Sequence, residues 1–563
     1  MNASRSDVDR AWWKEAVVYQ IYPRSFNDSD GDGIGDLPGI TERVDYLAEL
    51  GVDVVWLNPV YESPMADMGY DIADYRAIHP AFGTMADWEE LRDELHDRGI
   101  RLIMDLVVNH TSDEHGWFRR SRAGEEPYDD YYVWRPGEPD EPPNNWEAFF
   151  GGSAWTYDEA RGEWYLGLFT PEQPDLNWEN PQVREEVHDV VRFWLGKGID
   201  GFRMDVINLV SKAEGLPDGD PESPLVGAEH FVDGPRIHEY MNELSTEGFG
   251  EREIMVVGEC VGVDPETALD YCGRKSDAMD MCIAFELMDV DRGDSRWEPT
   301  GWSLADLREV LVDWQETLGE EGWNCLYLNN HDQPRAVSRF GDDGEYRRES
   351  ATMLATLLHG HRGTPFVYQG EEIGMTNAPF ETPETLRDVE AINFVERRLE
   401  AGASFEELRP LLSAQSRDNA RTPMQWSDAE HAGFTDGEPW IGVNPNYEEV
   451  NVDREREADR SVFRYYRALI ELRHRSETLV YGDFEPLLPG HEEVYAIRRT
   501  LDDDRLVVVC NAFDGTPTVS LPDRTDGADA DLLLCNYGEG EPRLEDLSLR
   551  PYEARIYRVG ETE

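Results

Sequence analysis

Short apolar segments alternate with helical patterns along most of this chain, and this alternation restricts the possible folds more than any other sequence feature. The segments are rich in Val, Ile and aromatic residues, which favours buried strands. Strands separated by helices close most simply into a (β/α)₈ barrel. A doubly wound sheet is the alternative, less favoured because no glycine-rich phosphate loop follows the first strand. The predicted strands are Val17–Tyr22, Val54–Leu57, Leu102–Val108, Gly201–Val206, Ile254–Val257, Met281–Phe285, Cys325–Leu328 and Thr364–Tyr368, with helical patterns at 40–50, 85–98 and 183–196.

The alternation lapses in two places. From His110 to about Asn180 the chain is rich in Pro, Gly and aromatic residues, and the segment is too long for a connecting loop. After about Val480 the pattern changes to alternating strands, such as Val494–Ile497. We therefore predict three domains: a barrel from residues 1–110 and 181–480, an inserted subdomain at 111–180, and a C-terminal antiparallel β-domain at 481–563.

The charge balance limits the setting and the partners. The chain has 563 residues and a formal net charge of −66, from 118 acidic and 52 basic side chains. At ordinary ionic strength this self-repulsion destabilises a compact state, whereas at molar salt the Debye length falls to about 3 Å. The sequence therefore predicts a halophilic protein that needs high salt for stability. The same charge argues against nucleic acid and anionic membrane partners.

The distribution of apolar and cysteine residues indicates a cytoplasmic protein. No apolar segment follows Met1 and no run of 18 apolar residues occurs, so we expect neither a signal peptide nor a membrane span. The six cysteines lack C-x-x-C spacing and several lie in apolar runs, as in Val507–Cys510. This is typical of reduced core cysteines. We expect a monomer or a weak homo-oligomer.

Charged residues occur where several predicted strands end. Arg203 and Asp205 are two residues apart, so they share one face of their strand. Alone, this pair indicates a structural ion pair, because buried charges are normally paired. Other polar residues, however, follow other strands: Asp105, Asn109, His110, Glu259, His331 and Asp332. Since catalytic groups in barrels lie at the C-terminal ends of strands, the set predicts an active site.

These motifs resemble glycoside hydrolase family 13, the α-amylase superfamily. The similar segments are Asp105–His110, Gly201–Asp205, Gly258–Glu259 and Asn330–Asp332. Further segments resemble the oligo-1,6-glucosidase and α-glucosidase branch: Gln173–Asn177, Tyr368–Met375 and Arg417–Trp426. The resemblance covers nearly the whole chain. It implies the barrel, the inserted domain and the C-terminal β-domain.

By this resemblance Asp205 is the nucleophile, Glu259 the general acid and base, and Asp332 the transition-state stabiliser. The residue types fit, because retaining cleavage needs two carboxyl groups about 5–5.5 Å apart. Arg203 favours the charged form of Asp205, and like-charge repulsion from Asp332 favours a protonated Glu259. His110 would bond sugar hydroxyls, as would His331.

The resemblance also implies an exo-acting pocket. Asp67 and Tyr70 match the loop after the second strand, and Arg421 lies in the matching late segment. Asp67 and Arg421 would hold the 4-hydroxyl of the terminal glucose; the alternative is a surface ion pair worth less than about 1 kcal/mol. Val206, directly after the nucleophile, accompanies α-1,6 cleavage in this branch and favours isomaltose by about 1–3 kcal/mol at most. The choice between α-1,4 and α-1,6 linkages stays open.

An acidic loop at Asp28–Asp36 has the ligand spacing of a calcium loop. It departs from an EF-hand because position 12 is Gly39, and an acidic Gly-rich turn is the alternative. The resemblance implies a structural Ca²⁺ or Mg²⁺, and we expect no organic cofactor. The predicted ligands are Asp28, Asp30, Asp32, the Ile34 carbonyl and Asp36.

Three functions fit the sequence. The first is a retaining exo-α-glucosidase that acts on small oligosaccharides or disaccharides such as isomaltose and maltose. The second is a transferase or isomerase on the same site, such as a trehalose synthase, a sucrose isomerase or a transglucosylase. The third is a non-enzymatic relative, which the full set of three carboxylates argues against.

Overall fold

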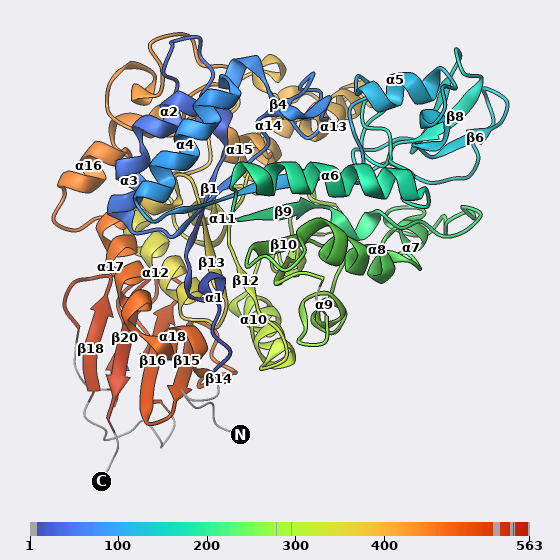
Figure 1. Cartoon of the computed structure of the whole chain (residues 1–563). Helices are drawn as coiled ribbons and strands as arrows, with labels where there is room; N and C mark the ends of the chain where they lie inside the picture. Colours follow the sequence, from blue (N-terminus) through green and yellow to red (C-terminus); the bar gives the residue numbers. More distant parts are fainter. Residues whose placement is uncertain are drawn as a thin grey trace.

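Eight parallel strands form the central sheet of the computed structural model, which describes residues 8–276, 278–293, 295–521, 530–540, 544 and 546–560 (Figure 1). The strands are β1 (Val18–Ile21), β2 (Val54–Leu57), β5 (Arg101–Val107), β9 (Gly201–Asp205), β10 (Met255–Glu259), β11 (Met281–Ile283), β12 (Cys325–Leu326) and β13 (Thr364–Tyr368). Their order is β11-β10-β9-β5-β2-β1-β13-β12, and a parallel bridge from Cys282 to Asn324 joins the two edges. The sheet therefore closes, and the predicted barrel is confirmed.

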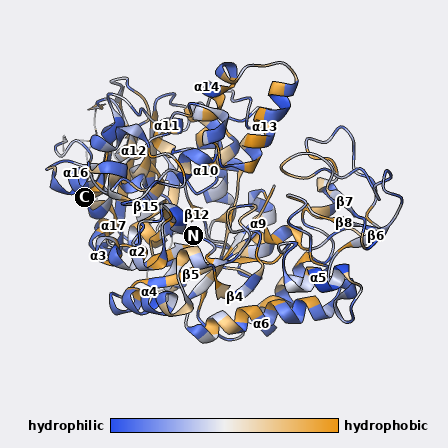
Figure 2. Ribbon diagram, turned by 90° about the horizontal axis from the view of Figure 1, so that it is seen from above, coloured by the Kyte–Doolittle hydropathy of each residue, from blue (hydrophilic) through white to orange (hydrophobic). Residues whose placement is uncertain are grey.

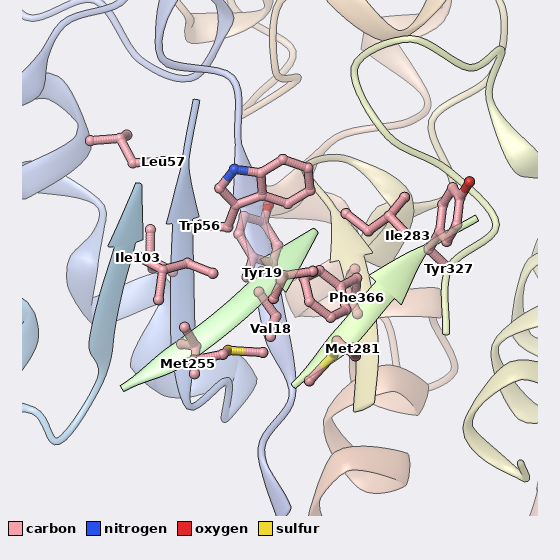
Figure 3. Close-up of a cluster of buried hydrophobic side chains, with 14 of the residues drawn as sticks. Val18, Tyr19, Trp56, Leu57, Ile103, Met255, Met281, Ile283, Tyr327 and Phe366 are labelled. Atoms are coloured by element: carbon pink, nitrogen blue, oxygen red, sulfur yellow. The ribbon is translucent and has the colours of Figure 1, made fainter. Parts of the chain in front are cut away.

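The barrel interior is filled by large apolar side chains. Figure 3 shows the Trp56 indole beside Phe366, with Ile103 contributed by the neighbouring strand β5 and Met255 by β10. Trp56 and Phe366 pack edge to face at 6.1 Å. Because these side chains close the barrel below the strand ends, polar groups can gather only at its C-terminal rim.

Helices surround the barrel, among them the amphipathic α4 (Met85–Asp97), α6 (Pro181–Lys197) and α10 (Leu304–Leu318), and α12 (Arg347–His359), which is buried along most of its length. Figure 2 shows hydrophobic and hydrophilic residues together along α6. This helix begins at a Pro after an Asn180 cap and ends at the left-handed Gly198. The predicted helix at 40–50 is instead two helices, α2 (Leu37–Glu42) and α3 (Val44–Leu50), because Arg43 leaves helical geometry. Within the described residues, no helix has the length and apolarity that a membrane span requires.

Among the described residues, two of the sheets outside the barrel have three or more strands. The strands β6 (Trp134–Pro136), β7 (Trp155–Asp158) and β8 (Glu163–Leu166) form a small antiparallel sheet inside the predicted insertion. The second sheet, β14-β15-β16-β20-β18, is antiparallel and lies at the C-terminal end of the chain (Figure 1). Its strands are β14 (Asp483–Pro486), β15 (Val494–Leu501), β16 (Asp504–Asn511), β18 (Ala530–Cys535) and β20 (Ala554–Val559). All six cysteines are free thiols.

A pair of helices that the sequence did not predict flanks the barrel rim. These are α13 (Val389–Glu400) and α14 (Phe405–Gln415). Phe394 of α13 stacks on Trp297 with ring centroids 4.4 Å apart. Asn393 of the same helix donates to the Phe150 carbonyl at 3.3 Å. The helix pair is therefore joined to the insertion across the C-terminal rim.

Candidate active site

A cavity of about 450 Å³ opens at the C-terminal ends of the strands. It brings together residues that are more than 250 positions apart in the sequence. Seven of the predicted site residues line it: Asp67, Tyr70, His110, Asp205, Val206, Glu259 and Asp332. The other three residues predicted for this site are Arg203, His331 and Arg421. They do not line the cavity, but each contacts a residue that does.

The buried Arg203 guanidinium holds three carboxylates. Its Nη1 atom lies 2.6 Å from Asp105 Oδ1 and 2.6 Å from Asp205 Oδ1, and its Nη2 atom lies 2.5 Å from Glu259 Oε1. Asp105 also accepts a hydrogen bond from Trp56 Nε1 at 2.7 Å. Since one arginine head binds both Asp205 and Glu259, it sets the separation of these two carboxyl groups on the cavity wall.

Burial dominates the protonation of this cluster. It raises the pKa of Asp205 to about 6 against the opposing charge of Arg203. It raises the pKa of Glu259 to about 7, again against Arg203, and the charges of Asp205 and Asp332 add to the increase. Glu259 is therefore the more readily protonated of the two near neutral pH. Two carboxyl groups whose pKa values are pushed apart are suited to acid and nucleophile roles.

Asp332 has the opposite electrostatic environment. Burial acts to raise its pKa, but His331, Arg417 and Arg421 outweigh it and hold the pKa well below the usual range. Arg421 Nη2 lies 2.9 Å and Arg417 Nη1 3.2 Å from its Oδ1 atom. His331 Nε2 lies 3.0 Å from Oδ2. Asp332 therefore stays ionised where positive charge could develop in the cavity.

A hydrogen bond and ring stacking fix the orientation of His331. Gln20 Nε2 donates to His331 Nδ1 at 2.9 Å, which leaves the proton on Nε2, toward Asp332. The imidazole stacks on the Tyr70 ring at 5.2 Å. Tyr70 therefore separates His331 from the cavity, and the predicted bond from His331 to a sugar hydroxyl stays a prediction.

Asp67 and Arg421, predicted to hold one glucose hydroxyl together, form no direct ion pair in the described structure. Arg421 instead donates to Asp332 and lies 5.9 Å from the Tyr22 ring. The arginine beside Asp67 is Arg417, whose Nη2 atom lies 3.9 Å from Asp67 Oδ1. Both arginines lie on the short helix α15 (Asp418–Arg421) or just before it, so four residues place them one turn apart. The predicted role of Arg421 at the terminal 4-hydroxyl stays a prediction, and Arg417 is the arginine nearer to Asp67.

His110 completes the wall next to Asp67. Its Nε2 atom lies 3.2 Å from the Tyr70 carbonyl and 3.2 Å from Gln173 Nε2. Gln173 donates in turn to Asp67 Oδ2 at 3.2 Å. Burial lowers the pKa of His110, so a neutral imidazole faces the cavity. Gln173 belongs to the segment 173–177 that resembles the glucosidase branch.

Val206 has a backbone conformation that β-branched residues rarely adopt. Its φ is +36° and its ψ is +42°, in the left-handed region. In this conformation the Val206 N–H donates to Glu259 Oε2 at 3.2 Å. The strained residue therefore contacts the acid–base candidate through its backbone while its side chain lines the cavity.

Comparison with known proteins agrees with this geometry. The model of the α-amylase catalytic domain matches residues 20–482.

The chain belongs to the α-amylase family.

Its relatives include the oligo-1,6-glucosidase of Parageobacillus thermoglucosidasius, which is 54% identical over 98% of this chain and 100% of its own length. Among solved structures, the trehalose-6-phosphate hydrolase of Bacillus licheniformis has a TM-score of 0.94 and 44% identity, and it covers 98% of this chain and 100% of its own. The isomaltulose synthase SmuA of Protaminobacter rubrum has a TM-score of 0.95 and 41% identity, with coverage of 98% and 100%. This α-amylase family member thus has both hydrolase and synthase relatives.

The cavity of this family member also contains residues that the sequence did not predict. Phe149, Phe150 and Phe169 form an aromatic wall from the insertion, and the guanidinium of Arg417 lies 4.8 Å from the Phe150 ring. Arg296 and Glu390 form an ion pair of 2.7 Å at the rim. These residues come from separate parts of the chain: the insertion, the segment between β11 and α10, helix α13 and the Arg417–Trp426 segment.

The acidic loop lies away from this cavity. Asp28, Asp30 and Asp36 present carboxylate oxygens within 4.8 Å of one another. Asp32 is not in this group, and its Oδ1 accepts from the Ile34 N–H at 2.8 Å. The oxygen donors suit a hard divalent cation such as Ca²⁺ or Mg²⁺.

A nearby segment braces the acidic loop. Thr435 Oγ1 donates to Asp28 Oδ2, and the Trp440 N–H donates to the Gly33 carbonyl at 3.0 Å. Gly33 has a φ of +91°, and a Cβ there would lie 1.9 Å from the Glu438 carbonyl oxygen. Only glycine fits at this contact.

Proposed function

We propose that this chain is a retaining exo-acting α-glucosidase that releases glucose from the non-reducing end of short α-glucosides. The observation that carries the proposal is the Arg203 guanidinium, which binds both Asp205 and Glu259 at the wall of the cavity. The 54% identity to an oligo-1,6-glucosidase over nearly the full chain supports the same reaction class.

The first step uses both carboxyl groups. Ionised Asp205 attacks C1 of the bound glucose, the glycosidic C1–O bond breaks, and the leaving oxygen takes the proton of Glu259. The product is a glucosyl ester of Asp205. Its formation passes through an oxocarbenium-like transition state, whose positive charge the ionised Asp332 stabilises.

The second step reverses these roles. A water molecule loses a proton to Glu259 and attacks C1, the ester bond to Asp205 breaks, and α-glucose leaves. Two inversions at C1 retain the anomeric configuration. The pKa of about 7 for Glu259 lets it serve as acid and then as base near neutral pH.

Cleavage of single glucose units would follow from a contact that blocks extension of the terminal glucose. We propose that Asp67 and Arg417, rather than Arg421, hold the terminal 4-hydroxyl. Their charged groups lie 3.9 Å apart, enough room for a hydroxyl to contact both. A residue linked through that oxygen would clash with Arg417, so longer chains enter only from their non-reducing end.

The second candidate is glucosyl transfer or isomerisation on the same site, as in the synthase relatives. It uses the same glucosyl ester and differs only in what attacks C1. Product analysis on isomaltose, maltose and sucrose separates the two. We expect glucose as the main product; isomerised disaccharides as the main product would favour transfer and overturn hydrolysis.

We further propose a high-salt cytoplasmic setting and a structural divalent cation in the acidic loop. A formal charge of −66 supports the first, because molar KCl screens the repulsion between surface carboxylates. Thermal unfolding at rising KCl tests it: the midpoint should increase up to molar salt. A midpoint that is unchanged or falls would contradict the halophilic assignment.

A further inference from the structure

A second cavity of about 480 Å³ lies between the insertion and the barrel, outside the catalytic cavity. Figure 1 shows the surrounding elements, β6 from the insertion and α8 (Ile237–Glu243), on the same side of the barrel. Its volume is close to that of the catalytic cavity, about 450 Å³. Both volumes fall within the range of small-molecule sites. The second cavity is therefore large enough for a disaccharide.

The walls of this second cavity combine apolar and hydrogen-bonding groups. Val133, Leu176 and Val210 provide apolar surface from three different segments. Lys212 lies at the inner end, and its ammonium group is 2.7 Å from Asp175 Oδ2 and 2.9 Å from Asn109 Oδ1. An ammonium group has three N–H donors. The contacts with Asp175 and Asn109 hold the ammonium group at the wall of the second cavity.

The charges around the second cavity balance. Arg236 pairs with Glu179, and Lys212 pairs with Asp175. The other charged lining residues, Arg135 and Glu214, have opposite signs. The cavity thus carries no net charge for an anion, although its polar groups can donate to and accept from hydroxyls. A neutral polyhydroxylated molecule matches this wall best.

Lys212 also connects the two cavities. Asn109, which accepts its hydrogen bond, contacts His110 Nδ1 at 3.3 Å, and His110 lines the catalytic cavity. Only three side chains therefore separate a ligand beside Lys212 from the catalytic cavity.

We propose that the second cavity is an accessory binding site for a neutral mono- or disaccharide. The ligand class rests on the proposed function, since the sugars present in excess would be substrate and product. The site binds the sugar without cleaving it, because Glu179, one of the two carboxylates in the lining, is paired with Arg236.

Titration calorimetry with isomaltose tests the accessory site in the Asp205→Asn variant, which binds but does not turn over the sugar. We expect two molecules bound per chain. Ala213→Trp or Glu214→Trp, added to that variant, should fill the second cavity, so that only one molecule of isomaltose binds per chain. Glu214 is exposed, so the Glu214→Trp variant should fold even if the Ala213→Trp variant does not. The matched control is Ala458→Trp, at an exposed position beyond α16 (Val452–Glu457). This variant should still bind two molecules of isomaltose per chain.

One bound molecule in every variant would overturn the accessory site. So would two bound molecules in both cavity-filling variants, since the second sugar would then bind elsewhere. In either case, isomaltose hydrolysis by the native chain leaves the proposed function standing. Failure of the native chain to cleave any α-glucoside would instead overturn the proposed function and the ligand class with it.

Discussion

Two acidic clusters in this protein differ in what offsets the repulsion between their carboxylates. In the catalytic cluster, Asp105, Asp205 and Glu259 surround the buried Arg203 guanidinium. In the loop cluster, formed by Asp28, Asp30 and Asp36, the described structure contains no pairing arginine or lysine. There the carboxylates accept from backbone N–H groups, Ser29 and Thr435.

The comparison shows what an internal cation contributes. A guanidinium fixed by three carboxylates keeps them in place without an ion from solvent, and burial then shifts their pKa values toward neutrality. The loop cluster has no such charge, so its repulsion is relieved best by a bound divalent cation. One cluster is therefore suited to proton transfer and the other to holding a fold together.

The largest expected effect comes from removing the nucleophile of the catalytic cluster. Asp205→Asn keeps the shape of the side chain but cannot form the glucosyl ester, so kcat on isomaltose should fall by at least about 10⁴-fold. The matched control, Asp97→Asn at the exposed end of α4, should keep full activity. Steady-state kinetics measures both. Turnover by the Asn variant within tenfold of the native rate would refute the assignment.

The loop cluster should respond to chelation and the catalytic cluster should not. EDTA should lower the unfolding midpoint of the native chain, and Asp28→Ala should lower it by about 2–4 °C and remove the effect of EDTA. Asp32→Ala is the control, because Asp32 is outside the group and its variant should stay sensitive. Differential scanning calorimetry provides the midpoints. Equal sensitivity of the Asp28 and native chains would exclude a cation there.

Because its pKa is raised, Glu259 lowers the stability of the folded protein at neutral pH. Because the folded protein holds this proton up to about pH 7 and the unfolded chain only to about 4.5, native stability should fall as pH rises between these values. Glu259→Gln removes the titration, so its stability relative to the native chain should improve by roughly 1–3 kcal/mol over that window. Denaturant unfolding at several pH values measures it. Glu90→Gln, at an exposed position, should show the same pH dependence of stability as the native chain. If Glu259→Gln also showed the native pH dependence, the raised pKa of Glu259 would be contradicted.

The smallest expected effect concerns linkage preference beside the catalytic cluster. Val206→Thr changes one methyl group to a hydroxyl on the cavity wall, so the ratio of maltose to isomaltose kcat/KM should rise by about 10-fold or less. Val206→Ile, which keeps an apolar β-branched side chain, is the control and should preserve the isomaltose preference. An unchanged ratio in the Thr variant would remove the preference for α-1,6 linkages and leave the glucosidase itself untouched.

The sequence predicted the parts of the molecule that depend on local pattern. Strand β13 matches its predicted range, and β9 differs by one residue, because both are short runs buried at every position, which the sequence shows as short, mainly apolar segments. Asp205 and Glu259 were found because strand ends converge in a barrel. The arrangement around Arg203 was predicted only in part, since the contact to Glu259 joins two strands.

The contacts that the sequence missed depend on elements far apart in the chain. Arg417 and Arg421 lie in one motif, and only the fold decides which of them meets Asp67. The Phe150 wall comes from the insertion and helix α13 from a separate segment, and only the fold brings both to the barrel rim. The accessory cavity likewise forms between β6 and α8, and no local pattern predicts the space between two elements.

The anomeric form of the first product tests the role of Asp205 most directly. Proton NMR of native-chain digests of isomaltose, recorded before mutarotation, distinguishes α- from β-glucose. Two displacements at C1, through the ester of Asp205, predict α-glucose as the first product. β-Glucose as the first product would mean a single displacement by water and would contradict the assignment of Asp205 as nucleophile.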